Sequence, residues 1–413
     1  MDADDPGSPQ GSHHVLEAEA PRHRRWLSIG LWIASAVIAL VAAFHIGGGW
    51  YFASQLDRRA LSAAERRESL APDYDLRIVA VDDRTITIAR SDEDDALRLE
   101  GVWGLAWEGG YGQLRDILSE DAGAVVRSFE VLRGEPPAPG VLAELDRRAF
   151  PGDPNEGFGI PFQDVVFEGD VGQFPAWFID GDDDTWVIYV HGNGMTRRDA
   201  LRSIPIAVDA AMPALVITYR GDEGAPDDPS RKLQYGRTEW RDLEAAVGYA
   251  VENGANDVIL HGYSMGGGVI LAFLLESSLS DRVAGVVLDA PMLDFNRTVE
   301  FQAADEDIPV VGIGLPRTLV ESAQLLATIR FDVDWDRLNY LARADELEAP
   351  ILLIHGDNDE DVPKSTSDEL ARLRPDIVTY VEVADAAHVE AWNVDPEFYE
   401  DEVARFIERV AGD

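Results

Sequence analysis

The chain of 413 residues contains 77 acidic and 35 basic residues, which gives a formal net charge of −42 at pH 7. Such an acidic surface repels the phosphates of DNA and RNA and therefore argues against nucleic-acid binding. The chain has no cysteine, which excludes disulfides, thiolate metal sites and a cysteine nucleophile. Hydrophobic residues make up 46% of the sequence, enough to build a core despite the charge.

The N-terminal part of the sequence predicts a disordered tail followed by a membrane anchor. Residues 1–25 contain almost nothing to bury. Residues 26–52 carry no formal charge, are mostly apolar and are long enough for a tilted transmembrane helix. Aromatic residues typical of membrane–water interfaces lie near both ends: Trp26, Trp32, Trp50 and Tyr51. We therefore expect a single-pass anchor, with a cleaved signal peptide and a buried core helix as alternatives.

Basic residues on both sides of this segment bear on its orientation. Arg22, Arg24 and Arg25 precede it and favour an N-terminal end in the cytoplasm. Further arginines shortly after the segment weaken that bias. We expect the N-in orientation, which places the large domain that follows outside the cytoplasm. We also expect a polypeptide that starts near Asp57 to be soluble, because the acidic residues that follow favour solubility.

Residues 57–150 are predicted to form a small β-rich accessory region and a linker. Two candidate strands flank a tight turn and a third candidate follows: Leu76–Val81, Thr85–Ala89 and Leu97–Leu99. The glycine- and aromatic-rich stretch 101–112 is expected to form a turn; it lacks a GxGxxG pattern and gives no reason to propose a nucleotide. The proline-rich stretch 136–140 is expected to be part of the linker.

From about residue 160 to residue 413, short apolar runs alternate with segments of helical spacing. The apolar runs have the continuous hydrophobic character of buried parallel strands: Trp186–Val190, Ala214–Tyr219, Val258–His261, Val283–Leu288, Ile351–His355 and Ile377–Val383. Strands that alternate with helices in this way predict an α/β domain with a doubly wound, mostly parallel sheet.

A candidate nucleophile lies between one of these strands and the apolar segment after it. The sequence Gly262-Tyr263-Ser264-Met265-Gly266 fits G-x-S-x-G and follows the strand that ends at His261. The flanking glycines permit a sharp strand-to-helix turn, so that the serine hydroxyl projects from the edge of the sheet. The N-terminus of the following helix favours negative charge beside it. The pattern predicts that Ser264 is a catalytic nucleophile.

A second glycine-rich loop follows the strand that ends at Val190. It reads His191-Gly192-Asn193-Gly194 and can turn backbone N–H groups towards the serine. We expect an oxyanion hole made by the backbone N–H groups of Asn193 and Met265. His191 and His261 each end a strand just before a glycine, so we expect them to support these loops rather than to act as bases.

A serine nucleophile needs a base, and the base needs an orienting acid. We expect Asp359 to be the acid, because it lies in a loop directly after a predicted strand. Asp357 in the same loop and Asp289 after another strand are alternative acids. His388 follows the last strand, and the order Ser264, Asp359, His388 is a known triad order. His388 is therefore the expected base.

Taken together, these motifs resemble those of the alpha/beta hydrolases. The resemblance rests on the HGNG loop, the GxSxGG elbow and the GxxDxxVP acid loop, and it covers roughly residues 160–413. It implies an α/β-hydrolase fold and a serine hydrolase that cleaves carboxylic esters through an acyl-enzyme. The same machinery would serve an amidase, a peptidase or a thioesterase, and a non-catalytic anchored binding protein is a further alternative. The expected partners are a small acyl substrate and the membrane, and neither a cofactor nor a metal is implied.

Residues 289–348 occupy the position at which this family carries a cap. Four apolar residues there are candidates for lining an acyl pocket, with a purely structural core role as the alternative: Val310, Val311, Ile313 and Leu315.

Overall fold

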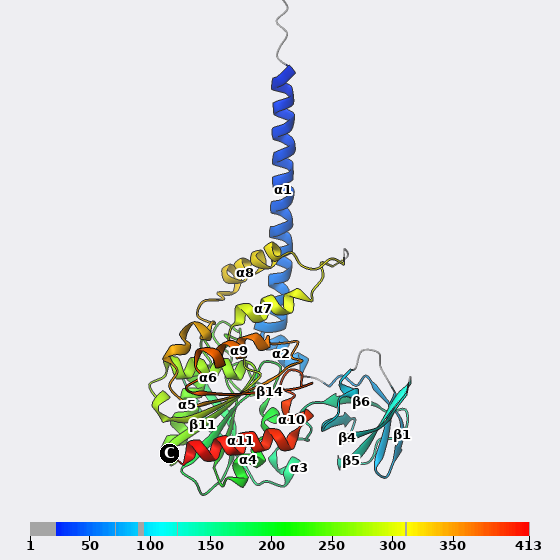
Figure 1. The fold of residues 1–413 in the computed structure, drawn as a ribbon, viewed down its shortest axis with the longest axis vertical. Coiled ribbons are helices and arrows are strands. Elements are labelled where there is room, and N and C mark those ends of the chain that lie inside the picture. Colours follow the sequence, from blue (N-terminus) through cyan, green and yellow to red (C-terminus); the bar gives the residue numbers. More distant parts are fainter. Residues whose placement is uncertain (1–21, 71, 90–94, 122, 310–311, 413) are drawn as a thin grey trace, which may run out of the picture.

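The computed structural model describes residues 22–70, 72–89, 95–121, 123–309 and 312–412. The molecule consists of a long N-terminal helix, a small β-barrel and a larger α/β unit (Figure 1). Most of the tail that we expected to be disordered, residues 1–21, lies outside the described residues, while residues 22–25 belong to the first helix.

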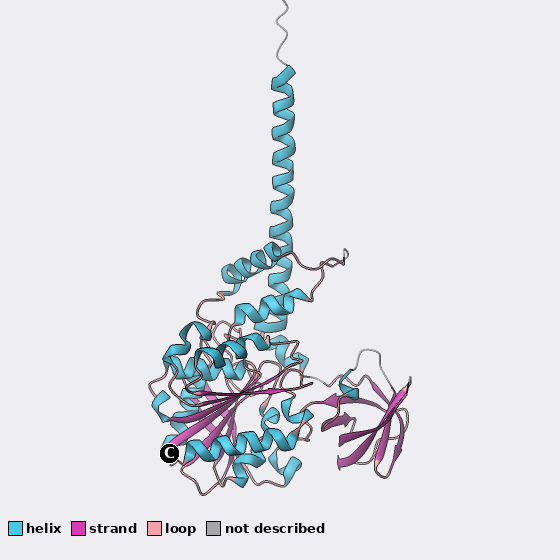
Figure 2. Cartoon of the chain, viewed as in Figure 1, coloured by secondary structure: helices cyan, strands magenta, loops and turns pink. Residues whose placement is uncertain are grey.

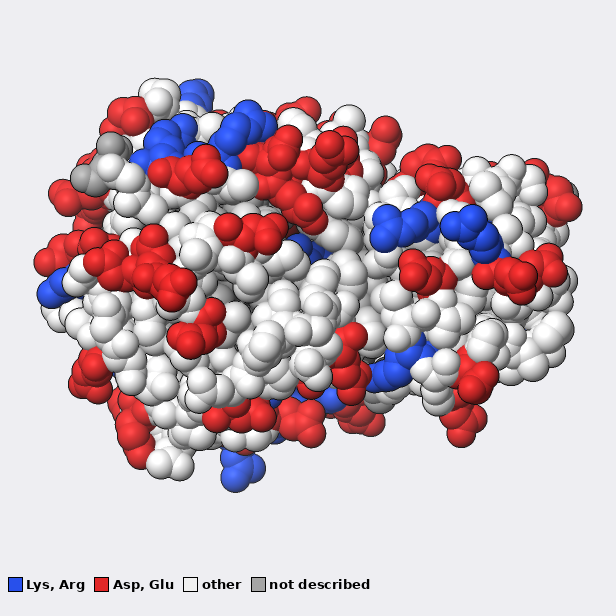
Figure 3. Space-filling view, turned by 90° about the horizontal axis from the view of Figure 1, so that it is seen from below, with Lys and Arg blue, Asp and Glu red and all other residues white. Residues whose placement is uncertain are grey.

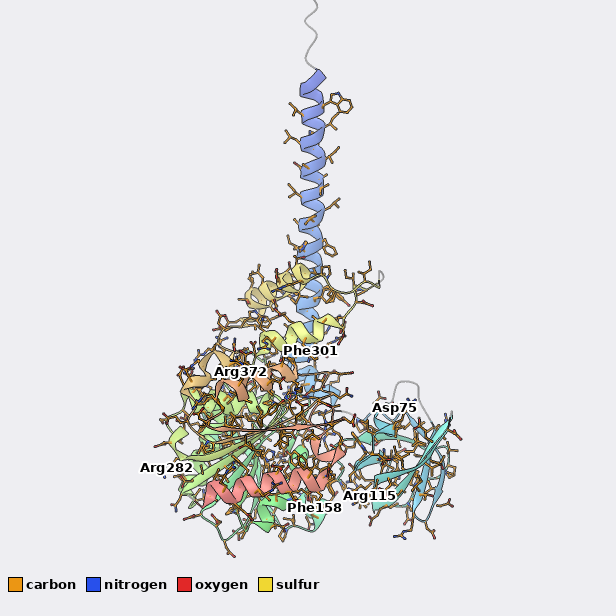
Figure 4. The ribbon with its side chains drawn as sticks, viewed as in Figure 1. Asp75, Arg115, Phe158, Arg282, Phe301 and Arg372 are labelled. Atoms are coloured by element: carbon orange, nitrogen blue, oxygen red, sulfur yellow. The ribbon has the colours of Figure 1, made fainter. Side chains whose placement is uncertain are left out.

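Helix α1 (Arg22–Leu56) is the predicted anchor segment. Its large hydrophobic side chains from Trp26 to Ile46 are exposed, and Figure 4 shows that the upper part of the helix stands clear of the rest of the molecule. The apolar stretch has a mean hydropathy of 2.3, and none of it is buried in the protein. The helix is thus long and apolar enough to cross a membrane, although an N-terminal signal sequence would share both properties.

The last turns of α1 pack against helix α8 (Arg317–Phe331). Glycines permit the close approach: a Cβ added to Gly48 would lie 2.8 Å from Leu319, and one added to Gly49 would lie 3.1 Å from Ser322. The N-terminal part of α1 is therefore exposed, whereas its last turns belong to the folded domain.

The chain remains packed into the α/β unit after α1 ends. A π-helical turn, Asp57–Leu61, leads to α2 (Ala63–Ser69). Ala53 before this turn and Leu61 at its end are buried in the main hydrophobic core, and Lys232 forms an ion pair with Asp57. A polypeptide that started near Asp57, as the sequence suggested, would therefore lack buried residues of the domain.

Six antiparallel strands in the described residues close into a barrel in the order β1-β2-β5-β4-β3-β6. The strands are β1 (Leu76–Asp82), β2 (Thr85–Ala89), β3 (Trp103–Trp107), β4 (Gly110–Glu120), β5 (Ala124–Arg133) and β6 (Leu142–Asp146). The predicted β1–β2 hairpin is confirmed. The third candidate strand is wrong, because Asp95–Arg98 forms a 3₁₀ turn. The proline-rich stretch connects β5 to β6 within the barrel and is not a linker.

The glycine- and aromatic-rich stretch forms the β3–β4 hairpin rather than only a turn. A Cβ added to Gly110 would lie 2.2 Å from the ring of Trp107, and one added to Gly112 would lie 2.3 Å from the ring of Phe129. Glycine in these strands makes room for the aromatic rings that fill the barrel. Composition alone does not distinguish that use of glycine from a turn.

The α/β unit contains an eight-stranded sheet in the order β14-β13-β12-β11-β9-β10-β8-β7. Its strands are β7 (Gln163–Gly169), β8 (Gly172–Ile179), β9 (Thr185–Val190), β10 (Ala214–Ile217), β11 (Asp257–Tyr263), β12 (Val283–Asp289), β13 (Ile351–Gly356) and β14 (Val378–Val383). The predicted mostly parallel sheet is confirmed, with β8 antiparallel to both of its neighbours.

Helices cover both faces of this sheet (Figure 2). The described helices of the unit are α3 (Pro154–Phe158), α4 (Ile204–Asp209), α5 (Trp240–Glu252), α6 (Met265–Glu276), α9 (Lys364–Leu373), α10 (Ala391–Val394) and α11 (Pro396–Ala411). In β9, Ile188 joins the core cluster of α5 and α6, whereas Val187 joins that of α4 and α11. Alternate residues of the strand thus face opposite helix layers. Helices α7 (Phe295–Ala304) and α8 form a cap beside α1, and Figure 4 labels Phe301 on α7.

Candidate active site

Ser264 occupies the sharp turn between β11 and α6. Its backbone angles are φ 51° and ψ −118°, a conformation that residues with a side chain rarely adopt. Close packing enforces the turn: a Cβ added to Gly266 would lie 2.1 Å from the carbonyl oxygen of Val190. The glycine of the motif is therefore required by the neighbouring strand.

The three residues predicted from the motifs meet at this edge. His388 Nε2 lies 2.8 Å from Ser264 Oγ, and His388 Nδ1 lies 2.8 Å from Asp359 Oδ2. Asp359 follows β13 and His388 follows β14. An ionised carboxylate only accepts hydrogen bonds, so Nδ1 donates to Asp359 and Nε2 is left to accept the serine proton. This is the hydrogen-bonded order that a serine nucleophile needs.

The carboxylate of Asp359 is held by several donors. Oδ1 accepts the backbone N–H groups of Asp361 and Val362 at 2.9 and 2.8 Å, and Oδ2 lies 3.1 Å from His355 Nε2. Burial raises the pKa of Asp359, but the hydrogen bonds from His355 and His388 outweigh it and hold the pKa well below its usual range. Asp359 therefore stays ionised beside the histidine. Sequence reasoning missed His355, because nothing marks it except its position at a strand end.

The two alternative acids have other partners. Asp357 is exposed and accepts the backbone N–H of Asp385 at 2.8 Å. Asp289 is buried and accepts from the Tyr399 hydroxyl at 3.1 Å, and burial raises its pKa. In the part of the chain that the structure describes, neither carboxylate has a hydrogen bond to His388. The geometry favours Asp359 over both.

The two strand-end histidines, His191 and His261, have hydrogen-bond partners away from Ser264. His191 Nε2 lies 2.9 Å from Asp222 Oδ2, within hydrogen-bond distance. His261 is fully buried, its Nε2 lies 3.1 Å from the Tyr399 hydroxyl, and burial lowers its pKa to about 3. A histidine held neutral in this way is suited to structural hydrogen bonding. Within the described ranges, neither histidine has a hydrogen bond to Ser264.

The HGNG loop lies directly against Ser264. A Cβ added to Gly192 would lie 2.9 Å from Ser264 Cβ, so only glycine fits there. The Asn193 side chain donates to the Tyr235 hydroxyl at 3.2 Å, which fixes the loop. Met265 is the first residue of α6, so its N–H has no partner within the helix. The assignment of Asn193 and Met265 as oxyanion donors stays a prediction.

A buried network that the sequence did not reveal supports the loop after β14. Arg202 donates to the carbonyl of Val389 at 2.9 Å and to the side chain of Asn393 at 2.5 Å. Val389 has a φ of 59°, so its peptide needs such a restraint. The amide of Asn393 also donates to the carbonyl of Val102 at 2.7 Å. The barrel thus contacts the segment that directly follows His388.

The family assignment follows from comparison with known sequences. The profile of the alpha/beta hydrolase family matches residues 187–402, more than half of the chain. The chain belongs to the alpha/beta hydrolase family. A second profile, described as a domain of unknown function (DUF8805), matches residues 77–146, which are the barrel of this alpha/beta hydrolase. No curated protein sequence matches the chain.

Solved structures show a likeness in fold. The Pyrococcus furiosus esterase Pf2001 is 20% identical, with 63% of this chain and 97% of that chain covered and a TM-score of 0.49. A predicted CIB-like hydrolase from Thermoplasma acidophilum is 17% identical, with 61% and 100% covered and a TM-score of 0.43. Est1E from Butyrivibrio proteoclasticus, solved with ferulic acid, is 19% identical, with 60% and 100% covered and a TM-score of 0.46.

Proposed function

We propose that this alpha/beta hydrolase is a membrane-anchored serine hydrolase that cleaves carboxylic esters through an acyl-enzyme. The observation that carries the proposal is the pair of 2.8 Å contacts from His388, one to Ser264 Oγ and one to Asp359. A strained serine at a helix N-terminus, hydrogen-bonded to a base that an ionised acid orients, is the arrangement that enzymes use for acyl transfer. Within the described residues no cluster of ligating side chains that could hold a metal accompanies it.

The acylation step follows from the geometry. Ser264 Oγ attacks the ester carbonyl carbon while its proton passes to His388 Nε2, 2.8 Å away. The resulting oxyanion is stabilised by the N–H groups of Asn193 and Met265, and the ionised Asp359 stabilises the imidazolium. His388 then gives its proton to the leaving alkoxide, the C–O bond breaks, and an alcohol departs from the acyl-enzyme.

Deacylation repeats the sequence with water. His388 takes a proton from a water molecule, whose oxygen attacks the acyl carbonyl carbon. The second tetrahedral intermediate collapses, the proton returns from His388 to Ser264 Oγ, and the carboxylic acid is released. Asp359 remains ionised throughout, as its low pKa requires.

The anchor forms the second part of the proposal. The bare stretch of α1 would span the bilayer, with the N-terminal end in the cytoplasm and the hydrolase outside it. The absence of buried residues in this stretch argues against the core-helix alternative.

Steady-state kinetics of a variant that lacks the Ser264 hydroxyl tests the proposed reaction. Ser264→Ala is expected to lower kcat for a p-nitrophenyl acyl ester by a factor of about 10⁴ or more, the scale of triad losses. Ser278→Ala, an exposed serine in the loop after α6, is the matched control and should retain activity. Parallel assays with thioester and amide substrates decide which bond is preferred. Full ester turnover in Ser264→Ala would contradict the proposal.

A further inference from the structure

We propose that a pocket between the domain end of α1 and the cap binds the acyl chain, and that the substrate is a long-chain acyl ester drawn from the membrane that α1 spans. This inference rests on the proposed function and names its substrate class. The pocket has a volume of about 130 Å³. Its apolar wall comes from three helices: Phe52 and Leu56 of α1, Val299 and Ala303 of α7, and Val320 and Ala323 of α8.

The chemistry of the lining favours a hydrocarbon chain. The pocket is smaller than the roughly 300–1,000 Å³ of sites for drug-sized ligands, so it suits a chain segment rather than a bulky polar molecule. Of the charged residues in the lining, Arg59 and Glu306 form an ion pair with each other. Leu315 lines the pocket as the sequence suggested, whereas Ile313 is 60% exposed, and Val310 and Val311 lie outside the described residues.

The position of the pocket along α1 places it next to the membrane surface. About 20 helical residues cross a hydrocarbon core of about 30 Å, so a span from Trp26 ends near His45. The first pocket residue, Tyr51, is six positions further on, a rise of about 9 Å at ~1.5 Å per residue. The headgroup layer on one side of a bilayer is about 5–7 Å thick. The pocket therefore begins close to the point at which the lipid headgroups end.

Exposed apolar side chains on the cap support this placement. Leu325 and Ile329, one turn apart on α8, are 62% and 69% exposed. Near the start of the same helix, the Thr318 hydroxyl lies 3.1 Å from Nε2 of His45 on α1. The start of α8 thus meets α1 where the span is expected to end. Leu325 and Ile329 lie about two and three turns further along α8, whose end contacts Trp50 and Ser54 of α1, and a lipid surface close to the pocket would cover them.

Two contacts join the wall of the pocket to the catalytic loops. The carbonyl of Ala60, a lining residue, accepts from the Tyr235 hydroxyl at 3.1 Å, and the same hydroxyl accepts from Asn193 of the HGNG loop at 3.2 Å. On the α7 side, Gln302 donates to the carbonyl of Asp361 at 2.9 Å, in the loop of the proposed acid. The wall of the pocket is therefore connected through hydrogen bonds to the loops that carry Asn193 and Asp361.

Chain-length selectivity of the full-length protein in phosphatidylcholine liposomes tests the pocket. For wild type, kcat/KM for p-nitrophenyl esters should rise from acetyl to octanoyl, with roughly fourfold per methylene as the upper limit set by about 0.8 kcal/mol per buried CH₂. Ala303→Trp fills the pocket and should lower the octanoyl-to-acetyl ratio of kcat/KM at least tenfold. The matched control, Ala304→Trp, places the same side chain at an exposed neighbouring position that does not line the pocket and should keep the ratio. An unchanged ratio in Ala303→Trp, or an equal fall in the control, would overturn the proposal.

A second measurement does not depend on the folding of Ala303→Trp. Full-length Ser264→Ala in liposomes is irradiated with a phosphatidylcholine that carries a diazirine at the end of one acyl chain. Adducts on the lining residues of α7 and α8 are expected, whereas adducts restricted to α1 before His45 would contradict the pocket. Pocket adducts together with full ester turnover in Ser264→Ala would refute the proposed function and retain the pocket. If Ser264→Ala loses ester turnover as expected but shows no adducts in the pocket, the proposed function would be retained and the pocket proposal refuted.

Discussion

The backbone of Ser264 is the clearest sign of function at the scale of single residues. A non-glycine residue at φ 51° costs about 1–3 kcal/mol and persists only where its surroundings enforce the conformation. Here Gly266 lies against the strand that ends at Val190, and Gly192 lies against the serine Cβ, so the turn is fixed from two sides. The turn holds Ser264 Oγ 2.8 Å from His388 Nε2, at a position where the serine is only 8% exposed. A merely structural serine would not need this conformation.

The choice of acid can be tested by two substitutions in one loop. Asp359→Asn should lower kcat by a factor of about 10⁴, because it removes the anionic partner of His388 Nδ1. Asp357→Asn, the matched control, should change kcat less than about threefold, because Asp357 is exposed and bonds only backbone in the described structure. Steady-state kinetics on a soluble acyl ester measures both. The opposite ranking would move the acid to Asp357.

Ser264, Asp359 and His388 could be selected from the sequence because each follows a predicted strand and because their order matches a known triad. The geometry brings these three together, and their catalytic role remains to be tested. His355 and Arg202 could not be found in this way. Arg202 contacts Val389, which is 187 positions away in the chain, and no local pattern encodes such a contact. Residues that support a site through tertiary contacts leave little sequence signal.

At the scale of elements, α1 has an exposed apolar part and a domain end that packs into the protein core. Its domain end carries Ala53, which is fully buried, and Trp50, whose ring lies 3.7 Å from the guanidinium carbon of Arg330. A protein that starts at Gly47 keeps these contacts, and one that starts at Asp57 loses them. We expect the shorter protein to be less stable by about 3 kcal/mol, equivalent to a Tm lower by ~4 °C at an unfolding entropy of about 2.1 cal/mol/K per residue. Thermal unfolding monitored by circular dichroism compares the two, and equal Tm values would contradict a structural role for this end of α1.

The alternation of apolar runs and helical spacing predicted the parallel part of the sheet well. The β7–β8 hairpin escaped prediction, because residues such as Gln163 and Gln173 interrupt its hydrophobic pattern at the edge of the sheet. The closure of the barrel also escaped prediction, because it depends on pairing between β1 and β6, which are far apart in the sequence. Local periodicity reports how a strand is buried and not which strand it pairs with.

At the scale of the whole molecule, most of the exposed large hydrophobic side chains lie on α1, whereas the surface of the folded part carries many charges. Figure 3 shows the face remote from α1, where acidic side chains are widely spread and basic side chains gather in a few places. Further exposed apolar side chains lie on the cap, on the barrel and on the α/β unit, for example Leu325, Leu118 and Phe398. This distribution suits a domain held at a membrane by its helix and kept in water by its charge.

Fractionation tests the anchor. The full-length protein should stay with membranes in high salt and alkali and should dissolve in detergent, because bilayer insertion of α1 depends on apolar contact and not on charge. In the N-in orientation, external protease should cleave the domain in intact spheroplasts. Cleavage only after lysis would show the opposite orientation.

The signal-peptide alternative is tested by intact-mass measurement of the mature protein. An N-terminus beyond residue 52 would show a cleaved signal peptide instead of an anchor.

Covalent labelling of Ser264 tests the central claim most directly. A fluorophosphonate reacts with a serine only when a base activates its hydroxyl. Intact-mass and peptide mass spectrometry of the wild-type protein should show one adduct, located on Ser264. The adduct should be absent from Ser264→Ala and retained in the control Ser278→Ala. An adduct of equal yield in Ser264→Ala, or a wild-type protein that remains unlabelled while folded, would contradict the account.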